Sequence, residues 1–228
     1  MSLPGVPPEG HPACRVKICG LRRPEDVEAV NRALPEYAGF VFAPGRRRVS
    51  AEEAARLRRD LDPRVAAVGV FVDEDPAVIA GLLGARIIAV AQLHGREDAG
   101  YIRLLRERCG CPIIKAVRVG EAPPALDGLP APPTGPDYPL FDAAPAGGPP
   151  GGSGRTFDWS LLHGCRGRPF FLAGGLTSAN VAEAIRRLSP FAVDASSGVE
   201  TDGQKDAGKI REFVGAVRAC RHGINGGR

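Results

Sequence analysis

The chain has 228 residues, of which 43% are hydrophobic, and a formal net charge of +4. No apolar run is long enough to cross a bilayer, so we expect no contact with a membrane. The basic residues are spread along expected helices, and three Tyr with one Trp provide no platform for stacking bases, so we expect no nucleic-acid partner.

Six cysteines are present, but the first 14 residues lack the basic and then apolar segments of a secretory signal. A chain of this length needs no disulfide bonds for stability, so we expect free thiols and a cytoplasmic location. The segment Cys109-Gly110-Cys111 is one residue short of a CxxC redox pair, and no His/Cys cluster has zinc spacing. We therefore expect no metal site.

Strand-like and helix-like segments alternate along the chain. Several strand-like segments are β-branched and apolar on both faces, as in Ala66–Val72, which is typical of a parallel sheet covered by helices. Helix-like segments begin with Pro24 in a first turn, or with a capping box from Ser50 to Glu53. We expect strands at residues 16–19, 39–42, 66–72, 87–93, 112–117, 138–141, 170–173 and 191–195, and helices at residues 24–34, 51–61, 76–83, 98–109, 178–188 and 206–220.

This alternation predicts one α/β domain folded as a (β/α)8 TIM barrel, with an open doubly wound sheet as the alternative. Crossover five, residues 119–137, is too rich in Pro and Gly for a full helix, so we expect a loop or one short turn. Residues 143–155 form a second Pro/Gly-rich loop inside the domain. We expect a disordered extension at residues 1–14, the barrel at 15–220 and a disordered tail at 221–228.

Polar and glycine-rich segments follow several strands, where (β/α)8 barrels place their chemistry. Cys19 ends the first expected strand and Asp142 follows the sixth. Taken alone, Cys19 is better explained as a small buried hydrophobe, and Asp142 is equally well explained as a solvated turn residue. Three later loops predict a phosphate site, because glycine lets backbone N–H groups approach an anion; they contain Gly151-Gly152-Ser153-Gly154, Gly174-Gly175 and Ser196-Ser197-Gly198.

A series of short motifs occurs in fixed order between residues 15 and 218: Lys17-Ile18-Cys19-Gly20, Gly39-Phe40-Val41-Phe42, Gly69-Val70-Phe71-Val72, Gln92-Leu93-His94-Gly95, Asp142, Gly151-Gly152-Ser153-Gly154, Phe157-Asp158-Trp159, Gly174-Gly175-Leu176 and Asp194-Ala195-Ser196-Ser197-Gly198-Val199-Glu200. This series resembles phosphoribosylanthranilate isomerase of tryptophan biosynthesis. The resemblance implies a cofactor-free barrel that converts N-(5-phosphoribosyl)anthranilate to 1-(2-carboxyphenylamino)-1-deoxyribulose 5-phosphate by an Amadori rearrangement.

By position, the resemblance implies that Cys19 is the general base and Asp142 the general acid of this reaction. A thiol acts as a base only when it is a thiolate, and Lys17 is not an assured activator, because it faces the same barrel end only if the strand curls. Burial in a barrel mouth raises the pKa of a carboxyl group, which allows Asp142 to hold a proton. The substrate phosphate is expected at Gly154, Gly174, Gly175, Ser196, Ser197 and Gly198.

Arg47 matches the family's arginine near the anthranilate carboxylate, which a guanidinium binds with two hydrogen bonds. This loop is one residue shorter than usual, so Arg46 or Arg48 remains an alternative, and at least one of the three belongs to a solvated basic turn. We expect His94 to line the pocket or form hydrogen bonds rather than act as the base. We expect Asp194 to orient the loop backbone.

The segment Asp158-Trp159 is expected to begin a helix, with the aspartate as cap and the tryptophan packed on the barrel. Three features depart from the family pattern: the Pro-rich crossover five, a loop about two residues longer between Asp142 and Gly151, and Arg22 in place of a threonine. The expected partner is a small phosphoribosyl substrate, and the expected assembly is a monomer or homodimer.

Two rival functions remain open from the sequence. One is an isomerase that also handles the histidine-pathway aminoaldose, but in related barrels that chemistry uses aspartates at the ends of strands one and five, and here strand one ends in Cys19. The other is a non-catalytic barrel that binds a phosphate ligand. It would require loss of the acid or the base, and both are present.

Overall fold

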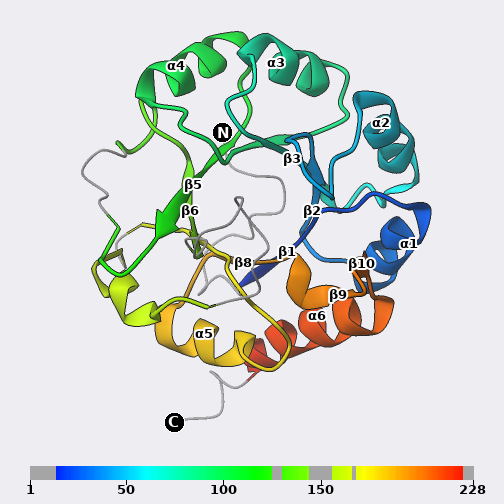
Figure 1. Cartoon of the computed structure of the whole chain (residues 1–228), viewed down its shortest axis with the longest axis vertical. Coiled ribbons are helices and arrows are strands. Elements are labelled where there is room, and N and C mark those ends of the chain that lie inside the picture. Colours follow the sequence, from blue (N-terminus) through cyan, green and yellow to red (C-terminus); the bar gives the residue numbers. More distant parts are fainter. Residues whose placement is uncertain (1–13, 125–129, 144–155, 166–167, 223–228) are drawn as a thin grey trace.

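The computed structural model describes residues 14–124, 130–143, 156–165 and 168–222. Within these residues, eight parallel strands follow one another around a closed barrel in sequence order, and β8 pairs with β1 to close it. The helices surround the strands on the outside (Figure 1). The expected (β/α)8 barrel is therefore confirmed, and the open-sheet alternative is wrong. Residues 1–13 and 223–228, most of the two expected terminal extensions, lie outside the described residues.

The barrel strands are β1 (Arg15–Cys19), β2 (Tyr37–Val41), β3 (Ala66–Phe71), β4 (Val90–Leu93), β5 (Ile113–Val119), β6 (Tyr138–Ala143), β7 (Phe171–Leu172) and β8 (Ala192–Ala195). The α-helices are α1 (Pro24–Ala33), α2 (Ala51–Asp60), α3 (Pro76–Gly84), α4 (Ala99–Arg108), α5 (Val181–Leu188) and α6 (Ala207–His222). The shorter elements are the 3-10 turns η1 (Trp159–Cys165) and η2 (Ser197–Val199) and a two-stranded ribbon of β9 (Glu200–Thr201) and β10 (Gln204–Lys205).

Apart from α5, the described α-helices begin within one residue of their expected starts. At α2 the capping box is complete: Glu53 N donates to Ser50 Oγ at 3.1 Å, and Ser50 N donates to Glu53 Oε2 at 2.7 Å. Helix α5 begins three residues later than expected. The reason is a turn in which Asn180 accepts a hydrogen bond from Thr177 N at 2.8 Å and donates one to Gly175 O at 3.0 Å.

Crossover five contains no helix in its described parts, residues 120–124 and 130–137, as its Pro and Gly content predicts. The connection between β6 and β7 contains only the 3-10 turn η1 in its described residues. Asp158 Oδ1 accepts a hydrogen bond from Ser160 N at 2.9 Å at the start of η1, and Trp159 is 7% exposed. These two residues therefore have the expected capping and packing roles.

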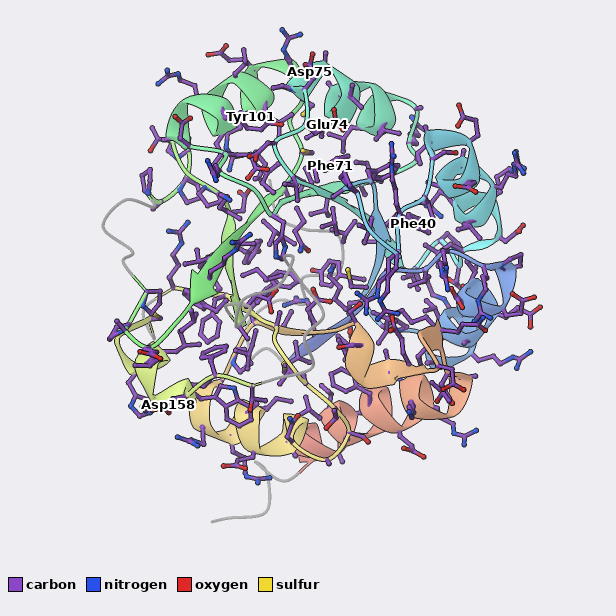
Figure 2. All side chains as sticks on the ribbon, in the orientation of Figure 1. Phe40, Phe71, Glu74, Asp75, Tyr101 and Asp158 are labelled. Atoms are coloured by element: carbon purple, nitrogen blue, oxygen red, sulfur yellow. The ribbon has the colours of Figure 1, made fainter. Side chains whose placement is uncertain are left out.

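Successive side chains of each strand point alternately into the barrel and toward the helices, which produces one apolar layer on each side of the sheet. Val68, Val90 and Phe171 belong to the cluster that fills the barrel interior. Side chains of the opposite parity face the helices: Phe40 packs in the cluster that includes α1 and α2, and Phe71 in the cluster that includes α3 and α4 (Figure 2). The rigid double layer holds the strand ends in place, and the strand ends carry the polar side chains.

All six cysteines are free thiols. In the part of the chain that the structure describes, no helix is both long and apolar enough to cross a membrane. The same residues contain no group of three or more His, Cys, Asp or Glu side chains arranged to hold a metal ion.

Candidate active site

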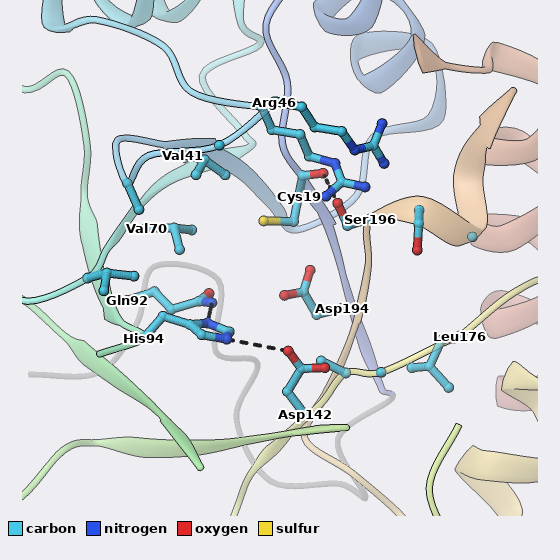
Figure 3. A pocket seen from close by; sticks show the side chains of 18 of the residues that line it. Cys19, Val41, Arg46, Val70, Gln92, His94, Asp142, Leu176, Asp194 and Ser196 are labelled. Carbon is cyan, nitrogen blue, oxygen red and sulfur yellow. Dashed lines mark hydrogen bonds and ion pairs between the residues drawn. The ribbon is translucent and has the colours of Figure 1, made fainter. Parts of the chain in front are cut away.

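A cavity of about 590 Å³ lies at the carboxyl ends of the barrel strands (Figure 3). This end is where barrels of this architecture hold their active sites. Its lining comes from β1, β2, β3, β4, β6 and β8 and from residues that follow β2, β3, β4, β7 and β8. Gly154 lies outside the described residues. Every other site residue expected from the sequence lines the cavity: Cys19, Arg47, His94, Asp142, Gly174, Gly175, Ser196, Ser197 and Gly198.

Cys19 and Asp142 point into this cavity from opposite sides (Figure 3). Cys19 is the last residue of β1 and is 8% exposed, and the side chain of Asp142, in β6, is 14% exposed. Strand alternation sets both directions, because Cys19 shares a face with the buried Lys17, and Asp142 shares one with Leu140 of the barrel interior. A thiol and a carboxyl group therefore face a common space.

His94 lies between Gln92 and Asp142. Its Nε2 atom is 3.4 Å from Asp142 Oδ2, and its Nδ1 atom is 3.3 Å from Gln92 Nε2. The Gln92 amide nitrogen in this orientation can only donate, so Nδ1 accepts and a neutral imidazole carries its proton on Nε2. His94 then donates to Oδ2 of Asp142, which leaves Oδ1 as the oxygen that carries a proton when Asp142 is protonated.

Lys17 and Asp194 form an ion pair beneath Cys19. Lys17 Nζ donates to Asp194 Oδ2 at 2.7 Å, and the lysine side chain is completely buried. The expectation that Asp194 orients the loop backbone is wrong, because one carboxylate oxygen pairs with Lys17 and the other, Oδ1, is buried without a hydrogen-bond partner among the described residues. Lys17, two residues before Cys19 on β1, leaves the strand on the same face as Cys19.

The glycine-containing loops form the edge of the cavity between β7 and β8. Gly174 and Gly175 have φ angles of +85° and +63°, a conformation that favours glycine. A Cβ atom added to Gly198 would overlap the carbonyl oxygen of Leu176, so the two loops approach as closely as glycine permits. Backbone in this conformation presents N–H groups to an anion, and this edge therefore suits a phosphate.

Arg47 lines the cavity but is already held by Glu200. Its Nε and Nη2 atoms donate to the two oxygens of Glu200 at 2.7 and 3.0 Å, and Glu200 also accepts from Arg46 at 2.6 Å and Lys205 at 2.7 Å. Burial alone would raise the pKa of Glu200, but the hydrogen bonds from Arg47, Lys205 and Arg46 outweigh it and lower the pKa to about 2. Of the three arginines considered, Arg46 and Arg47 line the cavity, and Arg48 is exposed outside it.

Further contacts join the Arg47 loop to Cys19 and to the loop after β8. The aliphatic part of Arg47 packs against Gly20, where a Cβ atom would come within 2.5 Å of Arg47 Cδ. Ser196 Oγ donates to the carbonyl oxygen of Cys19 at 3.0 Å, and Lys205 Nζ donates to the carbonyl oxygen of Ser196 at 2.9 Å. Sequence reasoning assigned no role to Glu200 or Lys205, because only the fold brings them to the arginine loop.

The geometry defines a class: the chain is a (β/α)8 barrel in which titratable side chains and glycine-containing loops surround one cavity at the carboxyl ends of the strands. The model of the N-(5′-phosphoribosyl)anthranilate (PRA) isomerase family matches residues 16–216. The chain belongs to this family, and it is an isomerase of tryptophan biosynthesis.

Individual relatives agree with the family match. The chain is 47% identical over 205 residues to N-(5′-phosphoribosyl)anthranilate isomerase of Endomicrobium trichonymphae, covering 90% of this chain and 98% of the relative. The crystal structure of phosphoribosyl anthranilate isomerase from Thermotoga maritima is 38% identical, with a TM-score of 0.79 and coverage of 90% and 99% of the two chains. Another crystal structure of this isomerase, 34% identical with a TM-score of 0.73 and the same coverage, contains reduced 1-(o-carboxyphenylamino)-1-deoxyribulose 5-phosphate.

Proposed function

We propose that this chain converts N-(5-phosphoribosyl)anthranilate to 1-(2-carboxyphenylamino)-1-deoxyribulose 5-phosphate, the third step of tryptophan biosynthesis from chorismate. The reaction requires one group that gives a proton to the ribose ring oxygen and one that removes a proton from C2′. The observation that carries the proposal is that Cys19 and Asp142 point into one cavity from opposite sides. A sugar bound between them meets an acid on one side and a base on the other.

In the first step, Asp142 is the acid. It gives the proton of Oδ1 to the ring oxygen, the bond between C1′ and that oxygen breaks, and the lone pair of the anthranilate nitrogen forms a protonated Schiff base. The contact of 3.4 Å between His94 Nε2 and Asp142 Oδ2 places a hydrogen-bond donor beside the carboxylate that results. His94 therefore stabilises the charge that develops on Asp142 as the ring opens.

In the second step, the Cys19 thiolate removes the proton from C2′. The electron pair of the C2′–H bond moves into the Schiff base and forms an enolamine, which tautomerises to the aminoketose. Burial raises the pKa of the Cys19 thiol, which opposes this role, and the charge of Lys17 acts in the opposite direction. The positive Schiff base formed in the first step adds a second favourable charge beside the thiolate.

Binding of the two anionic ends of the substrate divides between two edges of the cavity. The phosphate is held by backbone N–H groups at Gly174, Gly175 and the Ser196–Gly198 segment. The carboxylate is held by Arg47, whose Nε and Nη2 atoms are fixed by Glu200 and whose Nη1 atom is left for the substrate. The sugar then spans the space between Cys19 and Asp142.

The test is turnover by the purified protein. The substrate is generated from anthranilate and phosphoribosyl pyrophosphate by the preceding transferase, and the isomerisation is followed as loss of anthranilate fluorescence. We expect turnover without an added metal or cofactor, and rescue of a tryptophan auxotroph that lacks this isomerase. A well-expressed, folded protein that neither turns over the substrate nor supports growth would overturn the proposal.

The cellular location and the assembly state of the enzyme are proposed as well. We propose a cytoplasmic enzyme that is a monomer or a homodimer. The reaction class supports the location, and a crystal structure of monomers derived from the dimeric Thermotoga maritima enzyme supports both assembly states within the family. Light scattering on the purified chain at micromolar concentration distinguishes the two states.

A further inference from the structure

The Lys17–Asp194 pair places two opposite charges inside the barrel. Lys17 is 0% exposed, and it pairs with Asp194 across the seam where β1 meets β8. Below the pair, the interior holds apolar and aromatic side chains such as Ala192 and Phe171, together with the buried Arg15 at the start of β1. Burying two charges is costly, and well-packed apolar residues in their place are often as stable or more so. Stability alone therefore does not account for the pair.

The position of the pair links it to Cys19. Lys17 and Cys19 are two residues apart on β1, so their side chains leave the strand on the same face. Burial would lower the pKa of Lys17, but the charges of Asp194 and of the Cys19 thiolate outweigh it and raise the pKa. Asp194 thus keeps Lys17 protonated in a place where a lone lysine would lose its proton. The pair therefore keeps a charged ammonium group on the strand face of Cys19.

Other charged groups face Cys19 less directly. Burial, which raises the pKa of Cys19, has the largest effect, the charge of Lys17 lowers it most, Asp194 raises it, and Lys205 lowers it. Lys205 is itself paired with Glu200 at 2.7 Å. The remaining charged or titratable groups that line the cavity come from the loop after β2, from β6 and from the end of β4: Arg46, Arg47, Asp142 and His94.

We propose that Lys17 is a positioning residue for the isomerisation: its buried ammonium group favours the thiolate form of Cys19 over the thiol, and Asp194 holds that ammonium group in its charged form. The proposal rests on the proposed role of Cys19 as the base. Lys17 itself does not line the cavity, so it acts through Cys19 and not on the substrate.

The test measures the thiolate directly, without the substrate. Iodoacetamide reacts with thiolates, so the pH dependence of Cys19 alkylation, followed by mass spectrometry of its peptide, reports the ionisation of Cys19. The variants are Lys17→Met, which removes the cation, and Lys17→Met/Asp194→Asn, which removes both charges and leaves no unpaired carboxylate. Cys220, partly buried on α6, is the internal reference in every sample.

We expect Lys17→Met to shift the alkylation of Cys19 to higher pH by about a unit or more, so that alkylation at pH 8 is roughly tenfold slower. The double variant should shift it in the same direction by less. The double variant shifts in this direction because the effect of Lys17 on the thiol exceeds that of Asp194. The acid limb of kcat/KM should shift in the same direction, and alkylation of Cys220 should not change. If Lys17→Met fails to fold, the double variant carries the test alone.

A purely structural role for the pair predicts a different result. The double variant, which replaces the ion pair by neutral groups of similar size, would then alkylate at Cys19 with the wild-type pH profile. That outcome would overturn the proposal, whether or not the protein isomerises its substrate. Shifted alkylation in a protein without isomerase activity would instead support the role of Lys17 and contradict the proposed function.

Discussion

The carboxylate of Glu200 accepts two hydrogen bonds from the guanidinium of Arg47, at 2.7 Å from Nε and 3.0 Å from Nη2, although 153 positions separate the two residues. This geometry fixes the plane of the guanidinium before substrate arrives. A group that is already oriented loses less conformational entropy on binding than a freely rotating arginine side chain. In the proposed function, Arg47 would therefore bind the carboxylate of the substrate as a preorganised donor.

This arrangement predicts unequal effects among the three consecutive arginines. Arg47→Ala should lower kcat/KM by roughly 10- to 100-fold, because a charge-assisted hydrogen bond to a carboxylate contributes about 1.5–3 kcal/mol. Arg46→Ala should have a smaller effect, and Arg48→Ala almost none, since Arg48 is exposed outside the cavity. Steady-state kinetics of the three single variants decide this. Equal small effects at all three would mean that the segment is only a solvated basic turn.

Replacing the thiol should stop the chemistry and leave the fold intact. Cys19→Ala removes one small buried atom, so we expect less than about 2 kcal/mol of lost stability and a near-complete loss of kcat. Cys165→Ala is the matched control, because Cys165 is similarly buried, at 6% exposure, but lies in η1 outside the cavity. A Cys19→Ala enzyme that keeps half of the wild-type kcat would show that the base is misassigned.

Asp142→Asn should lower kcat by orders of magnitude, because an amide cannot donate a proton as a carboxylic acid does. KM should change much less, since the proposed contacts to the phosphate and carboxylate of the substrate lie elsewhere in the cavity. Asp158→Asn serves as the control, because Asp158 only caps η1. A defect in KM alone for Asp142→Asn would indicate a binding role.

The glycine edge should be intolerant of a single methyl group. Gly198→Ala should raise KM, because the added Cβ atom overlaps the carbonyl oxygen of Leu176 and forces the two loops apart. Inorganic phosphate should compete with substrate in the wild type and bind more weakly to the variant. Gly81→Ala is the control: no atom lies within 4 Å of its added Cβ, and alanine suits a helix better than glycine. Equal inhibition of Gly198→Ala and Gly81→Ala by phosphate would mean that the anion binds away from the glycine-containing loops.

The pKa of Glu200, lowered from 4.5 to about 2, predicts a pH-dependent contribution to stability. A carboxyl group with a depressed folded-state pKa stabilises the fold fully above its unfolded pKa, and the contribution is lost as the pH falls toward the folded value. Glu200→Gln should therefore be less stable than wild type at pH 7, by on the order of 2 kcal/mol. The difference should shrink between pH 4.5 and 2.

Urea unfolding of both proteins across this pH range measures the difference for Glu200. Glu28→Gln is the control, because Glu28 forms an exposed ion pair with Arg32 and should show little effect at any pH. A constant gap between Glu200→Gln and wild type from pH 7 to pH 2 would mean that the carboxylate charge is not the source of the stabilisation.

Much of the barrel could be predicted because it is encoded locally. The capping box from Ser50 to Glu53 and the apolar strand Ala66–Phe71 act over a few residues, and their patterns identify element type and limits. Cys19 and Asp142 could be placed at the active end because each follows the apolar core of a strand. Helix α5 was misplaced because Asn180 binds the turn before it instead of starting a helix at residue 178.

The charge pairs could not be predicted in the same way. Strand parity places Lys17 on the face of Cys19, but nothing near Lys17 in the sequence identifies Asp194 as its partner. Glu200 stands in a motif that resembles a phosphate loop, and only the ribbon formed by β9 and β10 brings it to Arg47. Contacts of this kind depend on which strands become neighbours when the barrel closes.

The seam between β1 and β8 has a consequence for synthesis of the protein on the ribosome. Lys17 and Asp194 are 177 positions apart, so the cation below Cys19 gains its counter-ion only after nearly the whole chain has been made. The proposed effect of Lys17 on Cys19 therefore requires the last strand to dock. A truncated chain that lacks β8 should show none of it.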